Sequence, residues 1–283
     1  MNAPGIKPLT IQAIDVHGHY GQYIDPKIPL HDEFFSGSAE LVAQRARPAA
    51  VEWTVVSPLL SLFPRGKANA ATGNDEAAEI VPRTAGLLQW VVINPLQPET
   101  YRQAERMLAT SRCVGIKIHP EEHIYHISEH GREIFEFAER HRAVVLTHSG
   151  EQNSLPEDFV PFANSFPGMK LILAHLGMGW DGNNTYQVRA MQQSKHGNLY
   201  TDTSSARSMW AGLIEWAVRE LGPDRILFGS DTPLYSTGAQ RMRIEHAEIS
   251  DSARRKILSD NARQLLRLPV SPTATGSSAG SAK

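Results

Sequence analysis

Hydrophobic runs alternate with amphipathic segments along most of the chain. Each run is short and rich in β-branched residues, and a segment with helical periodicity follows it. The runs start about every 30 residues, which is the length of one strand–helix unit. The expected strands are residues 11–16, 51–56, 87–93, 113–118, 143–146, 170–174, 199–201 and 225–228. This pattern predicts a parallel sheet covered by helices.

Eight strand–helix repeats favour closure of the sheet into an α/β barrel of the (β/α)8, or TIM barrel, class. An open doubly wound sheet is the alternative, but it would normally carry a glycine-rich phosphate loop after its first strand. Here that strand runs instead into His17-Gly18-His19. The chain has 283 residues, enough for one barrel, so we expect a single domain over residues 1–268.

Three segments depart from the repeat. Residues 20–50 form a long connection after the first strand, with a helical patch expected near residues 39–47. We interpret this connection as a cap over a site because long loops in compact domains are usually functional or disordered. Residues 250–268 are expected to form one more amphipathic helix after the eighth strand. Residues 269–283 are rich in Ser, Thr, Gly and Ala without apolar periodicity, which predicts a disordered tail.

Composition narrows the class of protein. Lysine and arginine number 28 against 30 acidic residues, a net charge of −2, so nothing indicates nucleic acid or an anionic membrane as partner. No apolar run approaches the roughly 20 residues that span a bilayer. The N-terminus shows no signal-peptide core. A single cysteine, Cys113, excludes an internal disulfide framework and favours a reducing, cytoplasmic compartment.

Histidines follow the first expected strand. Side chains at positions i and i+2 of a strand point to the same face, so His17 and His19 are expected side by side. Two neutral imidazoles in that arrangement can chelate one metal ion. A His-x-His pair also occurs by chance, so the pair alone leaves a structural role equally open.

Other expected strands end on residue types that bind metals. The fourth ends on Lys117 and His119, and the fifth, sixth and eighth are followed by His148, His175 and Asp231. Singly, each has an ordinary interpretation, such as a hydrogen-bonded core histidine or a helix-capping aspartate. In a TIM barrel, however, the strands' carboxyl ends meet at the active site. Five strand ends in phase therefore predict a shared metal site.

Further polar and aromatic residues are expected on the same face, but the sequence supports a role in substrate binding for them less strongly. Arg207 could pair with a substrate carboxylate or belong to a surface ion pair, and Asp202 is expected to be structural. The remaining candidates for substrate contact are His119, His123, Tyr125, His126, Trp180, Trp210 and Tyr235.

The motifs at these strand ends resemble the amidohydrolase superfamily. They are Asp-Val-His-Gly-His (15–19), Gly-Ile-Lys-Ile-His-Pro (115–120), Leu-Thr-His-Ser-Gly (146–150), Ala-His-Leu-Gly (174–177), Tyr-Thr-Asp-Thr-Ser (200–204) and Leu-Phe-Gly-Ser-Asp-Thr-Pro (227–233). They are most similar to its amidohydrolase 2 branch of metal-dependent hydrolases and decarboxylases, which includes aminocarboxymuconate-semialdehyde decarboxylase. The resemblance covers about residues 11–268; it is specific for the fold and metal site but not for the substrate.

The resemblance implies roles for these residues. His17, His19 and Asp231 would bind the first metal, with His148 as the next ligand, and Asp231 would also accept a proton from metal-bound water. In mononuclear members, the residue at the position of His175 hydrogen-bonds that water.

In binuclear members, His175 would bind a second metal, and a carboxylated lysine would bridge the pair. Lys117 fits the position of that lysine, which the decarboxylases generally lack. Asp231 and His175 are therefore the expected catalytic residues, and His17, His19, Lys117, His148, His175 and Asp231 the expected metal ligands.

Because Lys117 favours a binuclear site, the first expectation is a metal-dependent hydrolase. It would use metal-activated water on an amide, ester, thioester or lactone of a small carboxylated substrate. The alternative is a mononuclear, metal-dependent, non-oxidative decarboxylase. A third interpretation, a barrel that has lost catalysis and only binds, is disfavoured by the intact ligand set.

One or two divalent metal ions are expected per chain. Zinc is the first choice, and iron, manganese and cobalt also suit imidazole and carboxylate ligands. The expected partners are a small-molecule substrate and a second copy of the chain in a homodimer.

Overall fold

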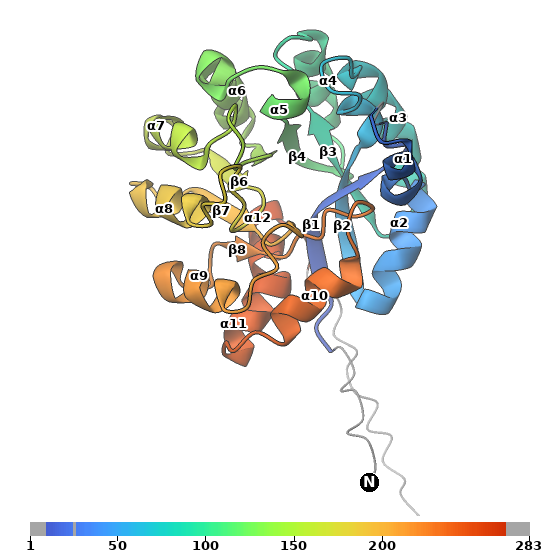
Figure 1. Ribbon diagram of the computed structural model, residues 1–283. Coiled ribbons are helices and arrows are strands. Elements are labelled where there is room, and N and C mark those ends of the chain that lie inside the picture. Colours follow the sequence, from blue (N-terminus) through green and yellow to red (C-terminus); the bar gives the residue numbers. More distant parts are fainter. Residues whose placement is uncertain (1–9, 25–26, 270–283) are drawn as a thin grey trace, which may run out of the picture.

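Eight parallel strands form one sheet in the computed structural model, which describes residues 10–24 and 27–269. Each strand pairs with the next along the chain, in the order β1 to β8, and Figure 1 shows helices surrounding them. The strands are β1 (Ala13–Tyr20), β2 (Val51–Pro58), β3 (Leu87–Val92), β4 (Cys113–Ile118), β5 (Val144–Thr147), β6 (Lys170–Leu173), β7 (Leu199–Asp202) and β8 (Ile226–Leu227).

Backbone hydrogen bonds close the sheet between β1 and the chain that follows β8. Val16 N donates to Phe228 O over 2.9 Å, and Asp231 N donates to His17 O over 2.7 Å. An isolated parallel bridge joins Gly18 to Thr232. The sheet is thus a nearly closed barrel, and the prediction of a TIM barrel is confirmed.

Helices connect the strands and cover their outer face. They are α1 (Pro29–Phe35), α2 (Ala39–Ala46), α3 (Ala70–Arg83), α4 (Glu99–Met107), α5 (Pro120–His123), α6 (Ile127–His141), α7 (Val160–Ser165), α8 (Tyr186–Gln193), α9 (Leu213–Leu221), α10 (Thr237–Glu245), α11 (Asp251–Arg255) and α12 (Asn261–Leu266). A π-helical stretch, Lys256–Asp260, joins α11 to α12, so the predicted C-terminal helix is present as one run with an irregular centre.

Apolar side chains fill the barrel. Trp90 is fully buried there, and its indole N–H donates to Val16 O over 2.8 Å. Ala262 and Leu266 of α12 belong to the same interior cluster as residues of β1 and β8, and the side chain of Asn261 donates to the carbonyls of Pro223 and Ile226 at the start of β8. Helix α12 therefore closes the amino-terminal end of the barrel.

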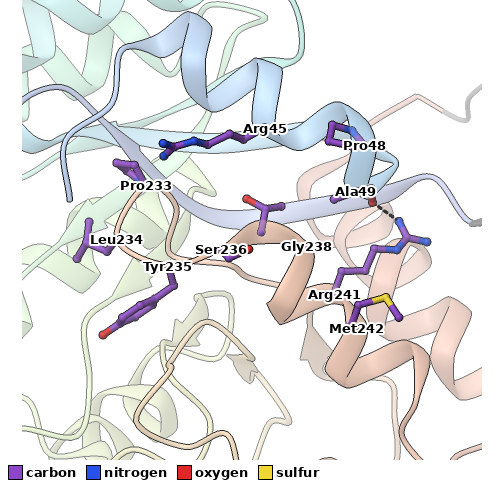
Figure 2. Close-up of a pocket in the computed structure, with 11 residues that line it drawn as sticks. Arg45, Pro48, Ala49, Pro233, Leu234, Tyr235, Ser236, Gly238, Arg241 and Met242 are labelled. Atoms are coloured by element: carbon purple, nitrogen blue, oxygen red, sulfur yellow. Dashed lines mark hydrogen bonds between the residues drawn. The ribbon is translucent and has the colours of Figure 1, made fainter. Parts of the chain in front are cut away.

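A fully buried arginine ties α10 to the start of the barrel. Arg241 donates to the carbonyls of Ala49, Ala50 and Ile11 over 2.7, 3.0 and 2.8 Å. It also pairs with Glu245 at 2.7 Å. Figure 2 shows the Arg241 side chain hydrogen-bonded to Ala49, and both residues line a cavity of about 540 Å³. These bonds fix α10, which follows the loop after β8, against the chain that leads into β1 and β2.

Several expected boundaries differ from those observed, that of the first strand most. This strand was expected to end at Val16 but continues to Tyr20, because its pairing with β2 runs on through His19 opposite Ser57. Within residues 20–50, α2 lies where a helical patch was expected, and α1 is an additional helix. The predicted tail lies outside the described residues, apart from Pro269. Among the helices described, none is long and apolar enough to cross a membrane.

Candidate metal centre and catalytic pocket

A cavity of about 390 Å³ opens at the carboxyl ends of the strands. The expected residues His17, His19, His148, His175 and Asp231 all line it. Each is at least nine-tenths buried. Five of the six side chains predicted from the sequence as metal ligands therefore lie together, because each lies at or near the carboxyl end of its strand. The sixth, Lys117, is buried next to His17.

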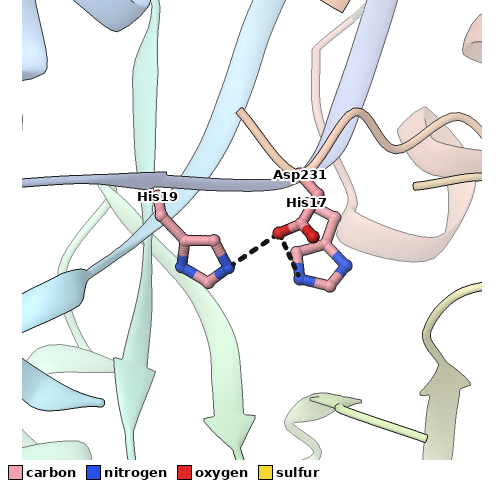
Figure 3. A group of neighbouring side chains, drawn as sticks. All are labelled: His17, His19 and Asp231. Atoms are coloured by element: carbon pink, nitrogen blue, oxygen red, sulfur yellow. Dashed lines mark ion pairs between the residues drawn. The ribbon is translucent and has the colours of Figure 1, made fainter. Parts of the chain in front are cut away.

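Three of these side chains point toward one another (Figure 3). Asp231 Oδ1 lies 3.2 Å from His19 Nε2 and 3.6 Å from His17 Nε2. Within the described residues, His17, His19 and Asp231 form one of two sets whose ligand atoms all lie close enough to hold a single ion; His17, His175 and Asp202 form the other.

On each imidazole, the hydrogen bond made by Nδ1 determines whether Nε2 presents a proton or a lone pair to this centre. His19 Nδ1 lies 3.0 Å from the hydroxyl oxygen and 3.2 Å from the backbone carbonyl of Ser57; the carbonyl can only accept, so a proton on Nδ1 satisfies both contacts. His17 Nδ1 lies 2.9 Å from a carboxylate oxygen of Asp202, with the same consequence. Burial lowers the pKa of His19 to about 4, which keeps this ring neutral. Both Nε2 atoms therefore present lone pairs.

Asp231 adds a negative charge to these lone pairs. Burial alone would raise its pKa, but the histidines beside it, His17 first, hold the pKa well below its usual range. Its backbone has φ +59°, in the left-handed region that residues other than glycine seldom adopt. Three ligand atoms thus converge, and with neutral imidazoles a divalent cation is the partner that this donor set fits.

Asp202, which was expected to be structural, contacts two histidines of the site. It lies at the end of β7, accepts from His17 Nδ1, and also accepts from the backbone N–H of His175 at 3.1 Å and from the Ser204 hydroxyl. It orients one proposed ligand and the loop of another histidine. Its position at a strand end was the available signal, and the partner it would contact was not visible in the sequence.

A line of hydrogen bonds runs from Asp202 to the rim of the cavity. The Ser204 hydroxyl donates to Asp202, so its oxygen accepts from His175 Nδ1 at 2.7 Å. His175 Nε2 then accepts from His148 Nδ1 at 3.1 Å, and His148 Nε2 lies 3.0 Å from Glu151. The line requires a proton on both nitrogens of His148. In agreement, the hydrogen bond from His148 lowers the pKa of Glu151.

His148 is thus placed between His175 and Glu151, and it belongs to neither of the two donor sets above. Glu151, three residues beyond the strand-end histidine, was not singled out from the sequence. No motif marked it, since a glutamate in a loop is usually solvated.

Lys117 lies where β4 passes His17. Its Nζ is 3.0 Å from His17 Nε2, the atom aimed at the metal centre. Burial lowers the pKa of Lys117 to about 8, against the attraction of Asp231 and Asp202. The side chain is 1% exposed, so it sits beneath the donor atoms rather than at the mouth of the cavity.

The rim of the cavity comes from several loops and from α1. Tyr23, His31 and Phe35 line it, so the segment expected to cap a site does cover part of this one. Arg65 pairs with Glu122 at 2.7 Å, and both line the cavity. This pair was not anticipated.

Some of the weaker candidates for substrate contact line the cavity and others do not. His119, Arg207 and Tyr235 line the cavity, and Arg207 lies 3.9 Å from Glu151. The other five named from the sequence do not belong to the cavity lining that the structure describes. They are His123, Tyr125, His126, Trp180 and Trp210.

The amidohydrolase family model matches residues 14–268 of the sequence. The match spans most of the chain and includes the donor residues described above. The chain therefore belongs to the amidohydrolase family, as its motifs indicated.

Several solved structures share this fold at low sequence identity. The 5-carboxyvanillate decarboxylase of Sphingomonas paucimobilis has a TM-score of 0.72 at 14% identity, with 92% of this chain and 100% of that chain covered. The dihydroxybenzoic acid decarboxylase of a Polaromonas species, solved with manganese and 2-nitroresorcinol, has a TM-score of 0.69 at 18% identity, with 91% and 97% covered. A 2,6-dihydroxybenzoate decarboxylase bound to its substrate has a TM-score of 0.69 at 16% identity, with 91% and 98% covered.

No curated protein matches the sequence.

These comparisons correct the first functional expectation. The sequence favoured a hydrolase because Lys117 fitted the position of a bridging lysine, but the three similar structures described above are decarboxylases. The physical weakness of the argument is that a lysine at the end of β4 can also be buried against a strand-end histidine without bridging two metals, and Lys117 lies against His17 in this way. The expectation of zinc also finds no support, because three of the similar decarboxylase structures contain manganese.

Proposed function

We propose that this protein is a metal-dependent, non-oxidative decarboxylase of small aromatic carboxylates. The observation that carries the proposal is the lining of one cavity, which combines a cation-binding donor set with aromatic rings and guanidinium groups. The similar folds named as decarboxylases of hydroxylated benzoates add support.

The donor set would hold one divalent ion, and manganese is our first choice. His17, His19 and Asp231 supply two neutral imidazoles and one carboxylate. When bound, such an ion polarises the oxygens of a carboxylate or of a neighbouring hydroxyl group. Asp231 is ionised and aimed at the ion, so we assign it to holding the metal.

The walls of the cavity suit a flat, anionic substrate. Tyr23, Phe35, Phe63 and Tyr235 supply aromatic faces and edges against which a benzoate ring can pack. Arg207 is mostly exposed and lies 3.9 Å from Glu151, a distance at which the pair contributes little. Its guanidinium is therefore available to a substrate carboxylate.

Loss of CO2 leaves an electron pair on carbon, which must receive a proton. The His148–His175 pair holds a proton between Nδ1 and Nε2 at 3.1 Å, and both rings line the cavity. Glu151 lies 3.0 Å from His148 Nε2 at the rim. We assign His175 as the group that delivers this proton and His148 as the group that resupplies it.

The proposal is tested with the manganese-loaded protein and a panel of hydroxybenzoates that includes 2,6-dihydroxybenzoate and 5-carboxyvanillate. We expect release of CO2 and, in D2O, one deuterium on the carbon that carried it. A chelator should abolish turnover and manganese should restore it. A loaded, folded protein that releases no CO2 from any member of the panel would contradict the proposal.

Replacing Asp202 with asparagine is expected to weaken manganese binding by about 10- to 100-fold, the usual effect of removing an acceptor that orients a metal-binding histidine. The asparagine amide can donate to His17 Nδ1, which would turn the proton-bearing nitrogen toward the metal. Competition titration with a chelating dye measures the affinity. Circular dichroism checks the fold, and an unchanged affinity in a folded variant would remove Asp202 from this role.

His119 is expected to donate a hydrogen bond to the substrate. Its Nδ1 accepts from the backbone N–H of Glu122 at 3.3 Å, and burial lowers its pKa well below the usual value, so the ring proton resides on Nε2. The ring also stacks on His148 at 4.3 Å between centroids, which fixes its orientation.

Replacing His119 with phenylalanine should raise KM about tenfold or more, because one hydrogen bond to a charged group is lost, while kcat changes less. The His119→Asn variant can still cap α5 and donate, so it should recover part of the affinity. Steady-state kinetics of both variants separate the two parameters. An unchanged KM in the phenylalanine variant would exclude the contact.

A further inference from the structure

A second polar cavity lies at the opposite end of the barrel from the metal centre. Its volume is about 780 Å³, and its lining comes from residues at the starts of β5 to β8 and from α12. Cavities of this size accommodate small molecules. None of its lining residues belongs to the catalytic pocket.

Four basic side chains surround this cavity: Arg142, Lys170, Arg225 and Arg267. In the part of the chain that the structure describes, none of the four side chains has an ion-pair or hydrogen-bond partner. Like charges around one cavity disfavour each other. An anion between them would relieve that repulsion.

The two acidic residues of the lining are already engaged. Glu139 Oε1 accepts from the backbone N–H of Gly168 at 2.9 Å. Asp224 accepts from Lys256 at 2.5 Å. Neither carboxylate makes an ion pair with the four basic groups, so the cavity keeps an excess of positive charge.

Arg225 supplies a second, independent observation. Its Nη1 atom is buried and, among the described residues, has no hydrogen-bond acceptor. A buried donor on a charged group is costly to leave unpaired, and such a group in a folded protein usually marks a missing water or ion. Tyr200 also lines the cavity and adds a hydroxyl group. Burial raises the pKa of this phenol, and the positive charge of Arg225 acts in the opposite direction.

We propose that this cavity binds a phosphorylated small molecule, with Arg225 and Lys170 as the central anion contacts. An arginine presents two parallel N–H donors to phosphate oxygens, and a lysine adds a compact charge. The volume exceeds that of a phosphate ion alone, which favours a diphosphate or a phosphate ester. This inference is independent of the proposed decarboxylation, because the two cavities share no residue.

The test is titration of the purified protein with inorganic pyrophosphate by calorimetry and thermal unfolding. We expect binding and a rise in Tm of about 3 °C when pyrophosphate exceeds its Kd about tenfold. The Arg225→Gln and Lys170→Gln variants should each bind about tenfold more weakly. Arg45→Gln, which changes an arginine on the cavity beside α10, is the matched control and should bind as the wild type does.

Several outcomes would overturn the inference. Absence of binding at millimolar pyrophosphate would do so, as would binding that survives in both cavity variants and disappears in His17→Ala, because the anion would then occupy the metal centre. Equal binding of succinate would replace the phosphate assignment with a carboxylate. If Arg225→Gln does not fold, Arg267→Gln, which changes an exposed side chain, provides the second cavity variant.

Discussion

An Asp231→Asn variant is expected to lose at least about 10³-fold in kcat/KM for decarboxylation. The asparagine removes the one anionic donor of the set and leaves His17 and His19 as neutral ligands. Manganese should be retained at less than one equivalent per chain after desalting. Metal analysis and steady-state kinetics on the same sample connect the two losses.

The control is Asp181→Asn, which changes an exposed loop aspartate that accepts from Asn183 N and the Tyr186 hydroxyl. It removes the same charge from the chain without touching the cavity and should keep both metal and turnover. If Asp231→Asn bound manganese normally but remained inactive, Asp231 would act in catalysis rather than as a ligand. If the variant stayed fully active, the proposed centre would be wrong.

The Arg241→Met variant is expected to lose about 3–5 kcal/mol of unfolding free energy, as is typical when one partner of a buried charge network is removed. Three carbonyl groups, of Ile11, Ala49 and Ala50, lose their donor, and Glu245 loses its counter-charge. For a chain of this size we expect a fall in Tm of about 10 °C, measured by calorimetry.

Arg189→Met is the matched control for this loss. Arg189 is 53% exposed and pairs with Glu220 at 3.3 Å, so its replacement should cost less than about 0.5 kcal/mol. Equal stability of Arg241→Met and the wild type would show that the buried network contributes nothing net to folding. An Arg241→Lys variant should fall between the two, because an ammonium cannot reach all the carbonyls at once.

The sequence predicted the barrel and the meeting point of its polar residues for one physical reason. In a parallel barrel every strand runs the same way, so residues in phase at the strand ends must face one space, and His17, His19, His148, His175 and Asp231 do so. The register of one strand against the next was not needed. The positions of these residues at the strand ends were therefore enough to predict where their side chains meet.

Partners across the barrel could not be predicted in the same way. Asp202 supports His17 from the far side of the closure, and Glu151 supports His148 from a loop. Arg65, in the loop after β2, meets Glu122 of α5. Such pairs depend on loop paths and rotamers, which periodicity does not encode. Reaction type was misjudged for a related reason, since Lys117 was assigned by position before its contact with His17 was known.

The metal centre lies at the joint between the first and last strands that closes the barrel. The joint between β1 and the chain after β8 has only a few backbone hydrogen bonds, with Asp15 reaching Ser230 across 215 positions of sequence. His17 and His19 lie on one side of this joint and Asp231 on the other. An ion bound by all three would fasten the first strand to the last, so metal loading would determine how often the barrel opens along that line.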